Sequence, residues 1–110
     1  MILREIVSRC SGLAVSEMRI DQDDYYEVVV LNHEIDQWEK ILTAILGPPR
    51  KPKGVQPSEE DLNLTRGSGG IRVNQTLFER SFGDYMIIAK FWPWDDEEHT
   101  TLKMAYLSIS

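Results

Sequence analysis

The sequence predicts an α+β fold, a two-layer sandwich in which one or two helices pack on a four- or five-stranded, mainly antiparallel sheet. The prediction rests on one long amphipathic stretch, on runs of β-branched and aromatic residues before and after it, and on short turns between the last three runs. Because strands joined by short connections pair as antiparallel neighbours, we expect those three runs to form a C-terminal three-stranded meander.

Residues 32–46 form the predicted main helix. Apolar residues recur there at spacings of three or four, which places them in one stripe along a helix. The stripe consists of Ile35, Trp38, Ile41, Leu42, Ile45 and Leu46. Asn32 is a suitable N-cap, and Gly47 followed by Pro48 is a strong stop signal.

The chain before this helix predicts a β-hairpin. Residues 25–31 are rich in valine and tyrosine and indicate a largely buried strand. We expect residues 13–20 to be its partner strand, with the turn at residues 21–24, although the composition of that first segment also tolerates a helix. Residues 2–10 predict a short helix closed by Gly12, with a strand as the alternative.

Three further strands are predicted in the last third of the chain. They cover residues 70–80, 85–92 and 100–109, and turn-forming residues separate them. Pro93 has no N–H group to donate to a sheet, so we expect it at the end of its strand. These elements make a single α+β domain over residues 1–110, without internal repeats.

Composition and charge narrow the class of function. The chain has 110 residues and a net charge of -6, which argues against tight binding to nucleic acid or to an anionic membrane. No stretch reaches the roughly 20 apolar residues of a membrane span. Cys10 is the only cysteine, so we expect it to be a small buried side chain in a reducing, cytoplasmic compartment.

Residues 47–70 form a long Pro/Gly-rich segment and the best candidate for a working, flexible loop. They hold four of the five prolines and five of the seven glycines. A connection longer than about 12–15 residues is uncommon in a compact domain unless it is functional or disordered. Its basic run, Arg50, Lys51 and Lys53, lies between prolines and is expected to be extended, either as a docking segment or as a solvated linker. Ser58 and Asp61 have the spacing of a helix N-cap and its capping box.

Strand alternation sorts the side chains of the three C-terminal strands into two faces. The set predicted to lie under the main helix is Ile71, Val73, Gln75, Leu77, Ile87, Ala89, Phe91, Leu102, Met104 and Tyr106. The opposite set is half apolar, with Phe78 and Trp92, and carries four cations and no carboxylate. The cations are Arg72, Arg80, Lys90 and Lys103. This second face is either covered by the N-terminal helix or the long loop, or it is an open binding surface.

No motif in the sequence carries enzymatic or cofactor chemistry. Residues 67–70 are rich in glycine but lack the P-loop pattern, so a flexible approach to a strand is favoured over a phosphate cradle. His33 and His99 are not at metal-binding spacings, and the acidic run of residues 95–98 is expected to be a solvated hairpin tip. We therefore expect no cofactor and no metal, and no catalytic residue is assigned.

The sequence favours a small non-catalytic binding module whose partner is another protein or a second copy of the chain. Contacts are expected from the long loop and from the rim at Trp92 and Trp94, which flank Pro93. The first alternative is single-stranded nucleic acid on the cationic face; the second is a small-molecule-binding protein or enzyme with a pocket under the loop. No membrane contact is expected. The predicted binding residues are Arg50, Lys51, Lys53, Arg72, Arg80, Lys90, Trp92, Trp94 and Lys103.

Overall fold

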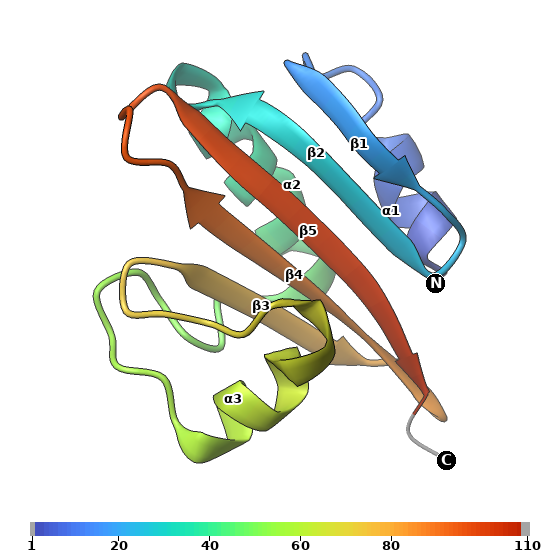
Figure 1. Ribbon diagram of the computed structural model, residues 1–110. Coiled ribbons are helices and arrows are strands. Elements are labelled where there is room, and N and C mark those ends of the chain that lie inside the picture. Colours follow the sequence, from blue (N-terminus) through green and yellow to red (C-terminus); the bar gives the residue numbers. More distant parts are fainter. Residues whose placement is uncertain (1, 109–110) are drawn as a thin grey trace.

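A five-stranded antiparallel sheet forms the body of the computed structural model, which describes residues 2–108 (Figure 1). The strand order is β1-β2-β5-β4-β3. The strands are β1 (Glu17–Asp21), β2 (Tyr25–Leu31), β3 (Thr76–Ser81), β4 (Tyr85–Pro93) and β5 (His99–Ser108). The predicted meander corresponds to β3–β4–β5, and residues 99–105 of β5 also pair with the whole length of β2. The α+β class is therefore confirmed, and Pro93 does end its strand; residue 109 of the predicted last strand lies outside the described residues.

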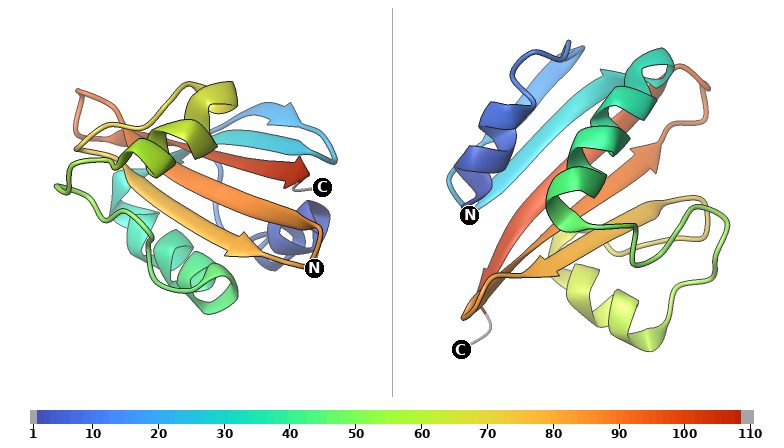
Figure 2. Two further views of the ribbon diagram at one scale, coloured as in Figure 1. Left: turned by 90° about the horizontal axis from the view of Figure 1, so that it is seen from below. Right: turned by 180° about the vertical axis from the view of Figure 1, so that it is seen from behind.

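Helices lie on both faces of this sheet. The helices α1 (Leu3–Arg9) and α2 (Ile35–Leu46) cover one face, and the short α3 (Glu59–Thr65) lies on the other (Figure 2). The capping box predicted for α3 is present, because Ser58 Oγ accepts from the Asp61 N–H and the Asp61 carboxylate accepts from the Ser58 N–H. None of the helices among residues 2–108 is long and apolar enough to cross a membrane.

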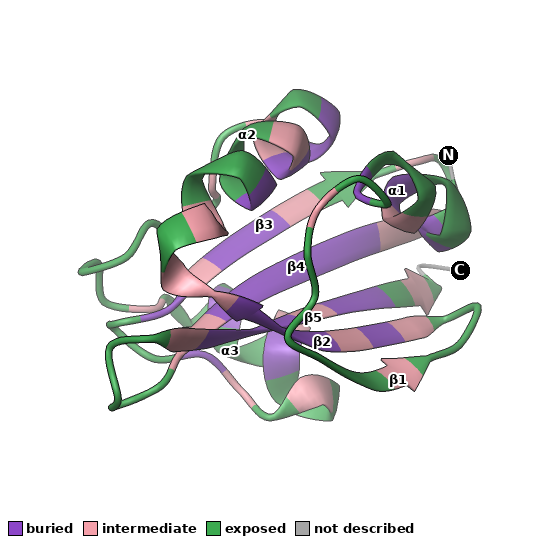
Figure 3. Ribbon diagram, turned by 90° about the horizontal axis from the view of Figure 1, so that it is seen from above, coloured by how far each residue is buried: buried purple, intermediate pink, exposed green. Residues whose placement is uncertain are grey.

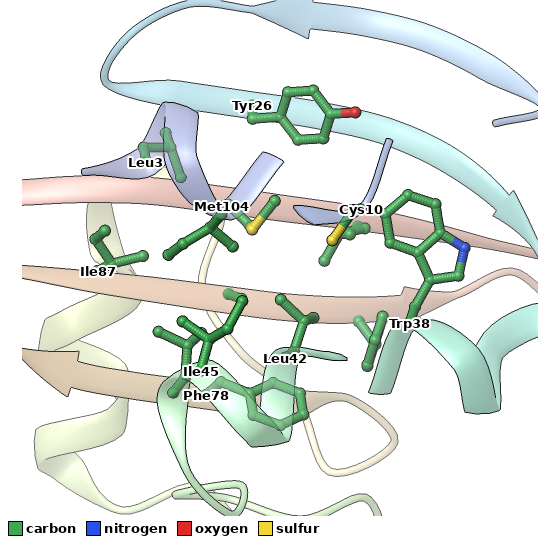
Figure 4. Close-up of a cluster of buried hydrophobic side chains, with 14 of the residues drawn as sticks. Leu3, Cys10, Tyr26, Trp38, Leu42, Ile45, Phe78, Ile87 and Met104 are labelled. Atoms are coloured by element: carbon green, nitrogen blue, oxygen red, sulfur yellow. The ribbon is translucent and has the colours of Figure 1, made fainter. Parts of the chain in front are cut away.

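The main core lies between the sheet and the two helices α1 and α2 (Figure 3). Trp38, Leu42 and Ile45 point from α2 toward side chains of the central strands, among them Met104 and Ile87 (Figure 4). Cys10 is buried in this core as expected, and burial raises the pKa of its thiol to about 11. The α2 stripe is thus confirmed as the core-facing side of the main helix.

The start of the main helix differs from the prediction. Residues Asn32–Glu34 form a 3-10 turn, and α2 begins at Ile35. Asn32 does not cap the helix, because its Oδ1 accepts a hydrogen bond from the Thr100 hydroxyl at 2.6 Å. A tertiary contact with the neighbouring strand has therefore replaced the local cap.

The predicted face assignment was wrong for the first strand of the meander. The strand β3 begins at Thr76, and the five residues before it form a turn in which the side chain of Gln75 accepts from the Arg72 N–H. Phe78 pairs with Ala89 and packs in the main core, whereas Leu77 lies on the opposite face with Ile88. Because the pleat has a period of two residues, this shift moves Arg80 to the helix face of the sheet as well.

The other face is partly covered, as one of the two sequence interpretations expected. A second, smaller cluster forms there from Ile71, Leu77, Ile88 and Ala105. The cover consists of α3 and the residues that follow it, which are the C-terminal half of the long loop and the turn before β3 (Figure 2). The end of this face near the C-terminus of β4 is hollowed.

Candidate binding site

An open groove of about 470 Å³ lies at that end of the sheet, on the face that bears α3. We call it the tryptophan groove. It is lined by Arg19, Glu27, Arg72, Asn74, Trp92, Pro93, Trp94, Asp95, Thr101 and Lys103. Four of the predicted binding residues therefore meet here, namely Arg72, Trp92, Trp94 and Lys103.

Strand register brings most of this groove together. Trp92 pairs with Thr101 across β4 and β5, and Glu27 pairs with Lys103 across β2 and β5. Residues at i and i+2 of β5 project from the same face, so the hydroxyl of Thr101 and the amine of Lys103 lie on one side of the sheet. Arg72 joins them from the turn before β3.

Trp92 forms part of the groove and is held firmly in place. The Lys103 Nζ lies 4.0 Å from its ring centroid and the Lys90 Nζ lies 5.4 Å from it. Gly69 approaches the ring so closely that a Cβ there would lie 3.0 Å from Trp92 Cζ3. The ring thus already has cation–π and packing partners.

Trp94 lies at the rim and is 37% exposed. Its Nε1 donates to the Thr101 hydroxyl at 2.8 Å. Its ring packs against His99 at a centroid distance of 4.8 Å, and the Arg19 guanidinium carbon lies 5.5 Å from the ring centroid. These contacts fix the orientation of the ring while leaving one edge of the groove apolar.

The cations of the groove differ in how they are paired. Arg19 contacts Glu17 at 2.8 Å and Glu27 at 3.7 Å. The side chains of Arg72 and Lys103, in contrast, have no carboxylate or carbonyl partner at hydrogen-bond or ion-pair distance among residues 2–108. Partial burial lowers the pKa of the Lys103 amine. The groove therefore presents two positive charges that no group of the described chain neutralises by direct contact.

Lys90 is buried beneath the groove and is not available to a ligand. It is 1% exposed, and its Nζ donates to the carbonyl oxygens of Ser68 at 2.6 Å and Gly70 at 2.9 Å. Burial, with a smaller contribution from the nearby charge of Lys103, lowers the pKa of Lys90 to about 8. The glycine-rich segment of residues 67–70 thus supplies backbone acceptors for Lys90.

Two residues of the basic run hold the long loop to the body. Lys51 is 1% exposed, and its Nζ donates to the carbonyl oxygens of Pro52 at 2.9 Å, Val73 at 3.1 Å and Gln75 at 2.5 Å. Its backbone forms an isolated bridge with Leu77 at the edge of β3. This segment is therefore paired with the sheet and is not the solvated polyproline stretch that the sequence favoured.

Arg50 also has internal partners. Its guanidinium lies 2.7 Å from Asp61, 2.9 Å from Glu60 and 3.0 Å from Glu79. Side-chain hydrogen bonding to Asp61 is the main cause that raises its pKa. The ion pairs tie α3 to β3, so Arg50 stabilises the fold of the loop.

The remaining predicted cations lie apart from the groove. Arg80 donates to the carbonyl oxygen of Ile45 at the C-terminus of α2, on the helix face. Lys53 is exposed and lines a second, mostly apolar hollow of about 310 Å³ together with Pro52 and Phe91. The nine predicted binding residues thus do not form one surface.

The predicted binding residues did not include five polar residues of the groove, namely Arg19, Glu27, Asn74, Asp95 and Thr101. The sequence predicts the strand that contains Glu27, but not that this strand pairs with β5. The position of Glu27 beside Lys103 therefore follows only from the strand order. The prediction of a face without carboxylates, made for the three C-terminal strands, was wrong because the changed register of β3 places Glu79 on that face beside Leu77. Glu27 and Asp95 add two further carboxylates at the groove. Glu27 accepts a hydrogen bond from the Tyr25 hydroxyl at 2.8 Å, so it is already engaged within the protein.

No protein-family model matches the chain, and comparisons with curated proteins and with solved structures find no match either.

Proposed function

We propose that the protein is a small, non-catalytic binding module that contacts another protein through the tryptophan groove. One observation carries this proposal: Arg72 and Lys103 lie beside Trp92 and Trp94 in an open groove, and neither cation has a carboxylate or carbonyl partner among residues 2–108. The protein as a whole has a net charge of -6. An even distribution of charged residues would therefore not be expected to gather such cations in one hollow. Arginine and tryptophan are also the residue types most enriched at interface hot spots.

Binding to single-stranded nucleic acid has weaker support from the same groove. Such binding uses aromatic faces on which bases stack. The Trp92 ring already contacts two ammonium groups and Gly69, and the Trp94 ring contacts His99 and Arg19. Arg80 and Lys90, which the nucleic-acid alternative also required, point elsewhere or are buried. The acidic net charge counts against it further.

A protein partner is more compatible with these constraints. A polypeptide does not require a free aromatic face for base stacking, and its side chains can fill an open groove whose two tryptophan rings already have contacts within the protein. Self-association is retained as one form of this proposal, although α3 and the following turn cover the part of the sheet face first considered for it. We place the protein in the reducing cytoplasm because its single cysteine is buried in the core.

Site-directed photo-crosslinking in an extract of the source cells tests the proposal. The photoreactive amino acid p-benzoylphenylalanine replaces Asn74, which is exposed in the groove, or Lys40, which is exposed on the outer side of α2. The proposal expects discrete protein adducts from position 74 that position 40 does not give. Adducts with nucleic acid alone, or the same protein adducts from both positions, would contradict it.

A further inference from the structure

We infer that the part of the partner that enters the tryptophan groove is an acidic segment, in which a carboxylate lies between Arg72 and Lys103 and a neighbouring apolar side chain contacts Trp94. This inference rests on the proposed function, because it names the chemistry of a protein partner at that groove. Its first basis is the charge balance of the groove, and its second is the arrangement of the two unpaired cations.

The charge balance excludes the other simple partner chemistries. The groove lining holds three cations, Arg19, Arg72 and Lys103, and two carboxylates, Glu27 and Asp95, so a positive charge remains in excess. Glu27 is already engaged with Tyr25 and lies near Arg19. Arg72 and Lys103 thus keep a net positive charge that a partner would cover. A neutral segment would remove water from these cations without replacing it, and a basic segment would add repulsion. A carboxylate supplies both the opposite charge and the missing hydrogen-bond acceptors.

The two cations suit a carboxylate in complementary ways. The guanidinium of Arg72 is exposed and can present two parallel N–H donors to both oxygens of one carboxylate. The amine of Lys103 is half-buried and is held against the Trp92 ring, so it loses little side-chain freedom when a ligand arrives. The lowered pKa of Lys103 indicates that its charge is poorly solvated, and a nearby anion relieves that cost.

Trp94 and Pro93 extend the same groove with an apolar rim. Trp94 is the more exposed of the two tryptophans, and its ring orientation is fixed by the hydrogen bond to Thr101. An apolar side chain next to the acidic one would bury this edge on binding. The groove thus fits alternating acidic and apolar residues better than a purely acidic tract.

Amide NMR titration of the full chain tests this inference with three synthetic ten-residue peptides. The peptides alternate leucine with glutamate, with glutamine or with lysine, and a ten-nucleotide oligothymidylate is titrated in parallel. We expect the glutamate peptide to shift amide signals of residues 72–74, 92, 94 and 101–103, and to bind about tenfold more tightly than the glutamine peptide.

A pair of matched variants separates site-specific binding from general attraction. The groove variant carries Arg72→Gln and Lys103→Met, and the control variant carries Arg9→Gln and Lys40→Met. Arg9 and Lys40 are exposed, and neither has an ion-pair partner among residues 2–108. Both variants lose the same two charges, and thermal unfolding establishes that each is folded. The groove variant should lose about tenfold in affinity for the glutamate peptide, and the control less than about twofold.

Different contrary results would overturn the acidic chemistry of the partner and the protein-binding function of the groove. Equal binding of the glutamate and glutamine peptides at the groove would overturn the acidic chemistry and leave a protein-binding groove. Equal losses in the two variants, or no shifts with any peptide, would also overturn the acidic segment, and the crosslinking experiment would still decide the proposed function. Groove shifts with oligothymidylate alone would overturn both.

Discussion

The ammonium nitrogen of Lys103 lies 4.0 Å from the centroid of the Trp92 ring. Lys90, two residues before Trp92 in β4 and the cross-strand partner of Lys103, lies 5.4 Å from the same centroid. One indole ring therefore contacts both a lysine that lines the groove and a lysine buried beneath it. Because Lys90 also donates to carbonyl oxygens of the glycine-rich segment, the Trp92 ring lies between this segment and the candidate binding site in the chain of contacts.

The close approach of Gly69 to Trp92 predicts that a side chain at position 69 lowers the stability of the fold. Gly69 has a φ of 96°, and a Cβ there would lie 3.0 Å from the ring. We expect Gly69→Ala to lower the free energy of unfolding by about 1–3 kcal/mol, through backbone strain and a steric clash. Urea unfolding followed by tryptophan fluorescence measures this change.

Two other glycines serve as graded controls for that variant. Gly70 also has a positive φ, 82°, but has open space where a Cβ would stand, and Gly67 has open space without a positive φ. Gly70→Ala should therefore cost about 1 kcal/mol, and Gly67→Ala should change stability by less than about 0.5 kcal/mol. Equal effects at all three positions would show that the contact with Trp92 is unimportant.

Lys51 is predicted to be a structural residue of the long loop. Lys51→Met would leave the carbonyl oxygens of Pro52, Val73 and Gln75 without their shared donor, so we expect a loss of about 2 kcal/mol. Hydrogen exchange should speed up first in residues 50–55 and 72–77. Lys53→Met, two residues away and exposed, should have little effect; similar losses in both variants would contradict the role assigned to Lys51.

Lys90 predicts a rise in stability at alkaline pH. Its pKa is about 8 in the folded protein, below the ordinary lysine value, so above pH 8 the unfolded chain binds more protons than the folded one. The contribution of Lys90 to the free energy of unfolding therefore increases as pH rises from about 8 toward the ordinary lysine pKa near 10.4, while Cys10, whose thiol pKa burial raises to about 11, acts in the opposite direction in the upper part of this range.

Urea unfolding at a series of pH values checks this rise, with Lys90→Met as the comparison. The variant should show a smaller slope, and the remainder comes from Lys51 and Lys103, whose pKa values burial also lowers. The series should stop near pH 9.5 because burial raises the pKa values of Tyr25 and Tyr26, which acts in the opposite direction at higher pH. An unchanged slope in the variant would mean that Lys90 does not titrate in this range.

The thiol of Cys10 is predicted to be unreactive in the folded protein. It is buried in the main core, and its pKa is raised to about 11, so little thiolate is present at neutral pH. Alkylation by iodoacetamide should proceed only as fast as the protein opens, and the rate should rise sharply in denaturing urea. Rapid labelling without denaturant would indicate an accessible cysteine.

The elements that the sequence predicted well are those determined by local pattern. The strand of residues 25–31 and the apolar stripe of α2 follow from periodicity, which is a property of neighbouring residues. The capping box of Ser58 and Asp61 is likewise local and was found. The fold class followed from these elements and from the short turns of the meander.

The features that escaped prediction depend on contacts between distant residues. The turn before β3 is held by Lys51 and Gln75, and no periodicity reports a lysine that donates to carbonyls more than twenty residues away. That turn changed the face of Phe78 and Arg80. The placement of Glu27 beside Lys103 needed the strand order, and the internal role of Arg50 needed the position of α3.

The measurement that tests the central claim most directly combines the photo-crosslinker at position 74 with the two matched charge variants. If the tryptophan groove binds a protein through Arg72 and Lys103, the adducts formed from position 74 should disappear in the Arg72→Gln, Lys103→Met background. They should persist in the Arg9→Gln, Lys40→Met background, which has the same net charge. Adducts that survive the groove substitutions, or that vanish equally in both backgrounds, would contradict the assignment of the groove as the binding site.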